Sequence, residues 1–181
     1  MYLVYMKTLL LLLFLASVSC VHAYDVVDGA RGGYVITATK ALTIATPSGE
    51  VVQLSPEPFI SNDWEMPPTA PIVCSWDPTG TWVAVFMQQA RMDSVFVFNL
   101  KTNTALVQND GPDVVFPEWY NAHGVVYSTV DTPGTWNGNS LTVNTRVLWR
   151  DASVPAREMP QVLTVAEDGS FSLRPVVEPA K

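Results

Sequence analysis

Short apolar runs separated by turn residues dominate the chain after residue 23. The runs are rich in Val, Ile, Thr, Phe, Tyr and Trp, and no helix-length window keeps the i, i+3, i+4, i+7 spacing free of Pro or Gly. This pattern predicts strands rather than helices. The expected strands cover residues 34–38, 42–46, 50–54, 72–76, 82–88, 94–99, 105–108, 114–116, 125–130, 141–149, 162–166 and 171–176.

Turn residues between these runs predict that neighbouring strands pair antiparallel. Each turn carries a residue that favours a bend: Pro at a fixed φ, or Gly or Asn where φ is positive. One of them has the Asp-Gly pair typical of hairpins. The four clearest turns cover residues 47–49, 77–80, 101–104 and 167–170. We therefore expect a domain built of antiparallel hairpins.

The strands recur along the chain as similar units. Trp76 and Trp119 lie 43 positions apart and hold the same place in two successive units, and Gly49 and Asn103 fall at the same bend of another matched pair. Repeats are expected near residues 34–58, 71–110 and 113–166, the first matching only the latter half of a unit. Four short strands with a period of about 40–45 residues are typical of a propeller blade.

Residues 75–85 read Ser-Trp-Asp-Pro-Thr-Gly-Thr-Trp-Val-Ala-Val, and residues 94–100 read Ser-Val-Phe-Val-Phe-Asn-Leu. They resemble the Ser-Pro-Asp-Gly-Lys turn and third strand of TolB-type propeller blades, which are similar to WD repeats. Asp77 precedes Pro78 here, whereas those blades have Pro before Asp, and Thr79 fills the usual Asp position. The resemblance covers residues 71–110 best and 113–166 loosely. It implies a small or partial β-propeller of four-stranded antiparallel repeats.

The number of units leaves the closure of such a propeller open. Residues after 23 hold only three to four blades of this length, which is the lower limit for a closed ring. A small propeller, a partial one completed by another copy, and a twisted β-sandwich are therefore all compatible with the repeats.

The first 23 residues differ from the rest of the chain. Lys7 is their only charge, a leucine-rich run follows it, and Val21-His22-Ala23 has the small residues of a signal-peptidase cut. The run is shorter than the ~20 residues of an untilted bilayer span. We expect a signal peptide over 1–23, with Met1 or Met6 as the start, and a periplasmic or secreted protein. A lipid anchor at Cys20 and an uncleaved membrane anchor are the alternatives.

Cleavage after Ala23 leaves one all-β domain over residues 24–176 and a short tail over 177–181. Loss of Lys7 takes the formal net charge from −7 to −8, and the remaining basic residues form no stripe, so nucleic-acid binding is excluded. Cys74 becomes the only cysteine and cannot close an internal disulfide. Its apolar neighbours predict a buried, unreactive thiol.

Catalytic and metal-binding chemistry is poorly supplied. His123 is the only histidine after the leader, and Cys74 with His123 falls short of the four Cys or His ligands of structural zinc. We therefore expect no cofactor, no metal and a non-enzymatic domain, and we interpret His123 as a solvated turn residue.

Two tryptophans lie in polar or proline-rich segments instead of strands. They are Trp64, next to Asp63, and Trp136, next to Asn137. A loop aromatic anchors a partner at small entropic cost, or else folds back on the core. We expect these four residues to bind a protein partner in the cell envelope or outside the cell, with self-association as a further option.

Two other functions use overlapping residues. In a carbohydrate-binding module, the same tryptophans would stack on sugar while Asp63, Asn137 and Asn139 bind hydroxyls. In a glycosidase-like propeller, carboxylates such as Asp63, Glu65 or Glu118 would need to lie about 5 Å apart for retaining chemistry.

Overall fold

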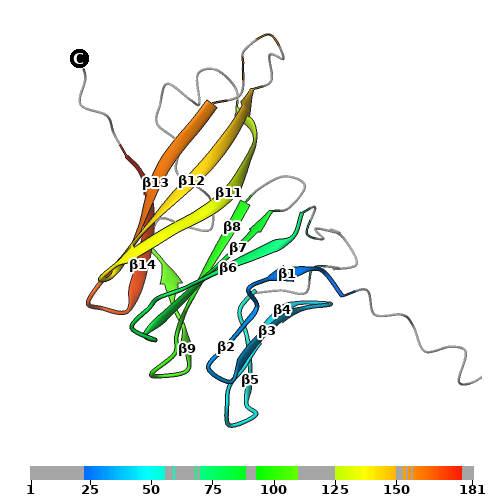
Figure 1. The fold of residues 1–181 in the computed structure, drawn as a ribbon, viewed down its shortest axis with the longest axis vertical. Helices are drawn as coiled ribbons and strands as arrows, with labels where there is room; N and C mark the ends of the chain where they lie inside the picture. The colour runs from blue at the N-terminus through cyan, green and yellow to red at the C-terminus, as the bar shows by residue number, and fades with distance from the viewer. Residues whose placement is uncertain are drawn as a thin grey trace, which may run out of the picture.

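The computed structural model describes residues 23–55, 59, 68, 70–88, 93–109, 125–149, 153, 155 and 157–176, with backbone alone for 93, 125–133 and 147–149. These residues form strands and turns and contain no helix. The strands make three sheets that lie one behind another (Figure 1). The expected all-β class with antiparallel four-stranded units is confirmed.

Each sheet contains four consecutive strands that run up and down. The N-terminal sheet has the order β2 (Ala30–Arg31), β3 (Tyr34–Ala38), β4 (Leu42–Ala45) and β5 (Val51–Gln53). The middle sheet has the order β1 (Val26–Val27), β6 (Ile72–Trp76), β7 (Trp82–Gln88), β8 (Asp93–Asn99) and β9 (Thr104–Ala105). The C-terminal sheet has the order β10 (Val107–Gln108), β14 (Ser170–Pro175), β13 (Arg157–Val165), β12 (Ser140–Trp149) and β11 (Val125–Asn137).

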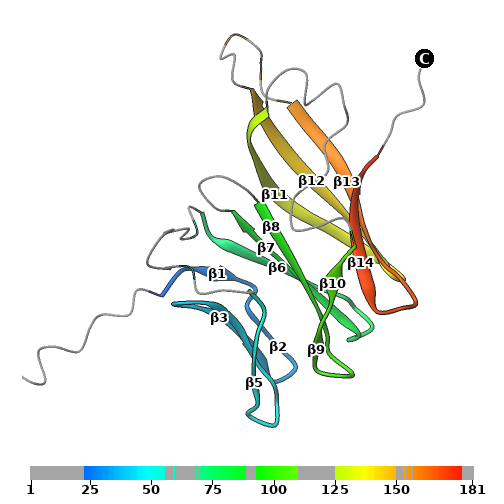
Figure 2. The same cartoon turned by 180° about the vertical axis from the view of Figure 1, so that it is seen from behind.

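Two short strands tie neighbouring sheets together. β1 precedes the N-terminal sheet in the chain but pairs in parallel with β6 of the middle sheet. β10 follows β9 of the middle sheet but pairs in parallel with β14 of the C-terminal sheet. The described strands form an open stack of three layers, with the middle sheet between the other two (Figures 1 and 2).

The middle sheet is buried on both faces, and β7 shows why its sequence is apolar throughout. Val83, Val85 and Met87 pack in the core shared with the N-terminal sheet. Ala84 and Phe86 alternate with them and pack in the core shared with the C-terminal sheet. All five are at most 3% exposed. Successive side chains of a strand point to opposite faces, so a strand between two layers needs an unbroken apolar run.

The predicted turns form as expected. Gly49, Gly80, Asn103 and Gly169 have φ values of 88°, 71°, 54° and 82°. Residues 49 and 103 each join the third and fourth strands of their sheets, β4 to β5 and β8 to β9. The matched bends inferred from the repeats are therefore structurally equivalent.

The sequence interpretation missed β1 and β2. Gly32 and Gly33 link β2 to β3, and both have positive φ, 61° and 86°. This is the pattern of a type I′ hairpin, for which Gly-Gly is a recognised signal. The N-terminal sheet therefore has four strands rather than the latter half of a unit.

The segment expected to be a loop around Trp136 is part of β11. Its pairing with β12 shifts register between Pro133 and Trp136, so the strand passes the Pro-Gly pair by an irregularity. A Cβ on Gly134 would lie 2.5 Å from the carbonyl oxygen of Thr142. The close backbone approach requires glycine there, and β11 is an edge strand, where proline is tolerated.

Other boundaries differ less. Residues 105–108 were expected as one strand, but the chain passes from the middle to the C-terminal sheet at Leu106. The N–H of Leu106 donates to Val97 O of the middle sheet (2.8 Å), and the N–H of Asn109 donates to Phe171 O of the C-terminal sheet (2.7 Å). The expected strand 114–116, most of the leader and the tail 177–181 lie outside the described residues.

Replacing Gly134 with Ala should lower the free energy of unfolding by about 1–3 kcal/mol, because the added methyl group meets backbone and β11 must move away from β12. Urea unfolding followed by tryptophan fluorescence measures this. Thr135→Ala, at an exposed neighbouring position, is the control and should change stability by less than about 0.5 kcal/mol. Equal effects would contradict the steric argument.

Candidate binding surface

Trp136 lies in the core between the middle and C-terminal sheets instead of at a loop tip. It is 6% exposed and packs among the buried residues of that core. Its Nε1–H donates to the carbonyl oxygen of Ser75 on β6 (3.2 Å). A buried ring with its one donor used is not available in this conformation to stack on a partner or a sugar. Of the two roles expected for Trp136, folding back on the core is the one that the structure shows.

The other predicted contacts do not gather around it. Asn137 is exposed at the hairpin between β11 and β12, where Gly138 has a φ of 60°. Asn139 is held by its Nδ2, which donates to Val165 O (2.6 Å). Asp63 and Trp64 lie outside the described residues, as does His123. Of the four predicted residues, the structure describes Trp136 and Asn137, the first buried and the second exposed.

Two other aromatic side chains join the N-terminal and middle sheets as Trp136 joins the middle and C-terminal ones. The Tyr34 hydroxyl donates to Leu100 O (2.5 Å) and lies 3.0 Å from Asn103 Oδ1. Trp76 Nε1 donates to Asp28 O (2.6 Å). Each ring contributes apolar area and one polar atom that reaches the next sheet. Tyr34, Trp76 and Trp136 therefore hold neighbouring sheets together. All three lie on strands, so none of them is a loop aromatic that could bind a ligand.

Asp77, which lies at the start of the turn between β6 and β7, has a structural role. It is 2% exposed and accepts hydrogen bonds from the N–H groups of Thr79 and Thr81 (both 3.1 Å) and from the Thr79 hydroxyl. Burial alone would raise its pKa, but these hydrogen bonds outweigh that effect and hold the pKa below its ordinary value. The carboxylate stabilises the β6–β7 turn.

The side chain of Cys74 is buried and shielded from solvent. It is 3% exposed, and burial, followed by the negative charge of Asp28, raises the pKa of its thiol to about 12. The predicted burial of Cys74 is confirmed, and because the thiolate is the reactive form, we expect low reactivity.

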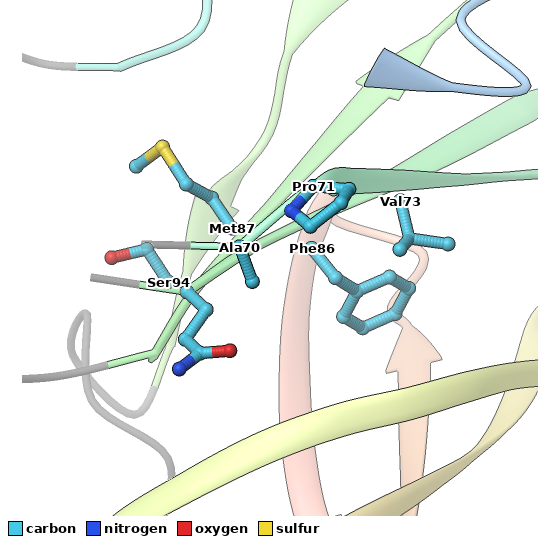
Figure 3. Close-up of a pocket in the computed structure, with 7 residues that line it drawn as sticks. Ala70, Pro71, Val73, Phe86, Met87 and Ser94 are labelled. Atoms are coloured by element: carbon cyan, nitrogen blue, oxygen red, sulfur yellow. The ribbon is translucent and has the colours of Figure 1, made fainter. Parts of the chain in front are cut away.

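The cavity at the end of the middle sheet offers little chemistry. It measures about 40 Å³, room for a few waters rather than for an organic ligand, which takes roughly 300–1,000 Å³. Its described lining consists of Ala70, Pro71, Val73, Phe86, Met87, Gln88 and Ser94, most of which are apolar (Figure 3). None of these seven side chains is titratable.

The part of the chain that the structure describes contains no group of three or more His, Cys, Asp or Glu residues placed to hold a metal ion. Within the same residues, no helix has the length and hydrophobicity needed to cross a membrane.

The outer face of the N-terminal sheet, which points away from the middle sheet, is uncharged. We call it the open face. It consists of two rows of paired residues, which are Ala30–Val35–Ala45–Val51 and Thr37–Thr43–Gln53. Val35 and Val51 are 43% and 64% exposed. An apolar row that crosses every strand of a sheet and remains uncovered is a candidate contact surface.

The opposite end of the stack is polar and charged. The outer face of the C-terminal sheet carries Arg146 paired with Glu158, and Arg174 in line with Thr142. All four residues are exposed. In stacked repeats, a polar outer face closes the end of the stack. By this criterion the C-terminal sheet is capped and the N-terminal sheet is not.

Comparisons of the chain with protein-family models, curated proteins and solved structures found no match. The candidate surface therefore depends on the geometry alone. The sequence signal that could have located it is the period-2 alternation in residues 34–38, where Val35 and Thr37 alternate with Ile36 and Ala38.

Asp77→Asn should reduce stability at neutral pH by about 1–2 kcal/mol, because the amide loses the charge that its three donors favour. A carboxylate whose pKa is lowered by folding stabilises the fold above its unfolded pKa and loses that effect as the pH falls through its folded pKa. The wild-type advantage should therefore shrink below about pH 4. Urea unfolding at pH 7 and pH 3 measures it.

The control for this test is Glu167→Gln, a charge removal at an exposed position in another turn, which should change stability by less than about 0.5 kcal/mol. A difference between wild type and Asp77→Asn that stays constant with pH would show that the carboxylate charge does not matter.

In the folded protein, Cys74 should resist Ellman's reagent at pH 8, because burial keeps the reagent away from the thiol and disfavours its thiolate form. In urea the same thiol should react fully. Peptide mass mapping assigns the modified cysteine and separates Cys74 from Cys20. Rapid modification of Cys74 without denaturant would contradict the burial.

Proposed function

We propose that this protein is an exported, non-enzymatic domain that binds another protein through the open face. The observation that carries this proposal is the asymmetry of the stack, with a charged outer face at one end and an uncharged, apolar row at the other. A contact surface for a protein is depleted in charge at its centre, and the open face has this property across all four strands.

Export fits the way the described fold begins. The N–H of Tyr24, the first residue after the expected cut, donates to Ala38 O (2.8 Å), and the Tyr24 ring contacts Phe59 edge to face (5.7 Å between centroids). β1 starts two residues later at Val26. A cleavage after Ala23 would therefore remove the leader without removing any residue that these contacts use.

The two rival functions gain no support from the described residues. Sugar binding needs an exposed aromatic platform, and Trp136 is buried. Asp63, Trp64, Glu65 and Glu118, which the rival functions would use, lie outside the described residues. Protein docking is the function for which a described surface exists.

A photo-reactive benzoylphenylalanine in place of Val51 tests the proposal in the producing cell. Illumination should give a cross-linked species in the envelope or secreted fraction, because the probe lies in the apolar row of the contact, at the more exposed of the row's two valines. The matched control places the probe at Thr142, on the charged face, where little cross-linking is expected.

Equal cross-linking from both positions would show that the open face is not the preferred binding surface. Retention of the protein in the cytoplasm would overturn the export part of the proposal. Both results are read from the same fractionated sample by immunoblotting.

A further inference from the structure

We propose that the partner of the open face is the same face of a second copy of this chain, so that two N-terminal sheets pack back to back. This inference rests on the proposed function. Across the strands, the apolar row alternates small and large, Ala30, Val35, Ala45 and Val51. A two-fold axis parallel to the strands reverses the order of the row in the second copy.

The reversed order places large residues over small ones along the whole row. Val51 faces Ala30 of the second copy, and Val35 faces its Ala45. Facing layers interdigitate when large and small residues alternate in this way. A two-fold contact requires a surface that is complementary to itself, and the register of these four strands supplies one.

The polar side chains of the open face are already hydrogen-bonded within the sheet. The hydroxyls of Thr37 and Thr43 lie 3.0 Å apart, and Gln53 Nε2 donates to Ser55 O (2.7 Å). Burying a polar group is costly mainly when it loses its partners. Pairing of the two faces would therefore exclude water while each of these three side chains keeps at least one hydrogen bond.

A head-to-tail arrangement is disfavoured by the other end of the stack. Placing the C-terminal sheet of one copy on the open face of the next would bury Arg146, Glu158 and Arg174 against the apolar row. Taking charged groups out of water against an apolar surface carries a large desolvation cost for each ion. The charged end therefore favours a closed pair over an open-ended chain of copies.

The size of the open face predicts a weak pair. Four strands about 4.8 Å apart and two rows of residues cover roughly 300 Å² on each copy. The total of about 600 Å² is below the ~1,200 Å² at the lower end of stable interfaces. The pair should therefore form in a concentration-dependent way, with its dissociation faster than that of a permanent dimer.

Sedimentation equilibrium of the protein purified from the exported fraction, over a wide range of concentrations, measures this pairing. The average mass should rise from one chain toward two and no further. Val51→Lys should raise the dissociation constant by about tenfold or more, because it buries an unpaired charge. Thr142→Lys, the matched charge on the opposite face, should leave it unchanged.

Ala45→Leu separates this packing from general hydrophobic attraction. The larger side chain would meet Val35 of the second copy, so two-fold packing predicts weaker pairing, whereas a merely sticky face would pair more strongly. Thermal melts of all variants at low concentration check that the fold is intact. Val51 and Ala45 are not core residues, so melting temperatures should stay close to that of the wild type.

A single-chain mass at every concentration, a pairing indifferent to Val51→Lys, or a stronger pairing with Ala45→Leu would each overturn self-pairing. The cross-link from position 51 then shows whether the proposed function survives. A cross-linked species at twice the mass of the chain agrees with self-pairing. A cross-link to a different protein instead retains the binding function and assigns it another partner.

Discussion

The fold depends on one requirement, that both faces of the middle sheet are covered at the same time. β7 carries apolar side chains on alternate faces with no polar face to offer to water. Fully burying one such side chain contributes roughly 1.5–3 kcal/mol, so neither neighbouring sheet can be dispensed with. The N-terminal and C-terminal sheets in turn need only one apolar face each, and the stack can end with them.

The aromatic residues follow from this requirement. Apolar contact alone is not directional and does not fix how one layer lies on another. An aromatic ring that also donates a hydrogen bond to the next layer does fix that position. Tyr34, Trp76 and Trp136 each place one polar atom against the backbone of the next sheet or its turns. Two of the six tryptophans, Trp76 and Trp136, therefore orient neighbouring layers in addition to filling space between them.

The local pattern of apolar and turn residues was sufficient to locate most strands. β3, β6 and β7 have the bounds that alternation and turn chemistry predict, because each is a short run between residues that favour a bend. β11 ran past its expected end, because a register shift opposite β12 accommodates a Pro-Gly pair that usually stops a strand. No local pattern reveals that accommodation, which depends on the partner strand.

The candidate surface was harder to predict for a related reason. Exposure of Val35 or Val51 can be read from alternation, but their common row with Ala30 and Ala45 exists only through the pairing of four strands. The misassignment of Trp136 has the same origin, since its sequence neighbours are polar while its spatial neighbours belong to β6 and the C-terminal sheet. The sequence around a residue indicates which strand or turn it belongs to, whereas its burial depends on the sheet that packs against that strand.

The exchange of β1 and β10 between sheets bears on how the molecule comes apart. The middle and C-terminal sheets each receive hydrogen bonds from a strand, β1 or β10, that is covalently continuous with the preceding sheet, so separating two layers also disrupts the edge of one of them. This coupling favours loss of the stack as one unit over independent melting of three small modules. A chain that seldom opens one layer at a time exposes few sites to cleavage by proteases.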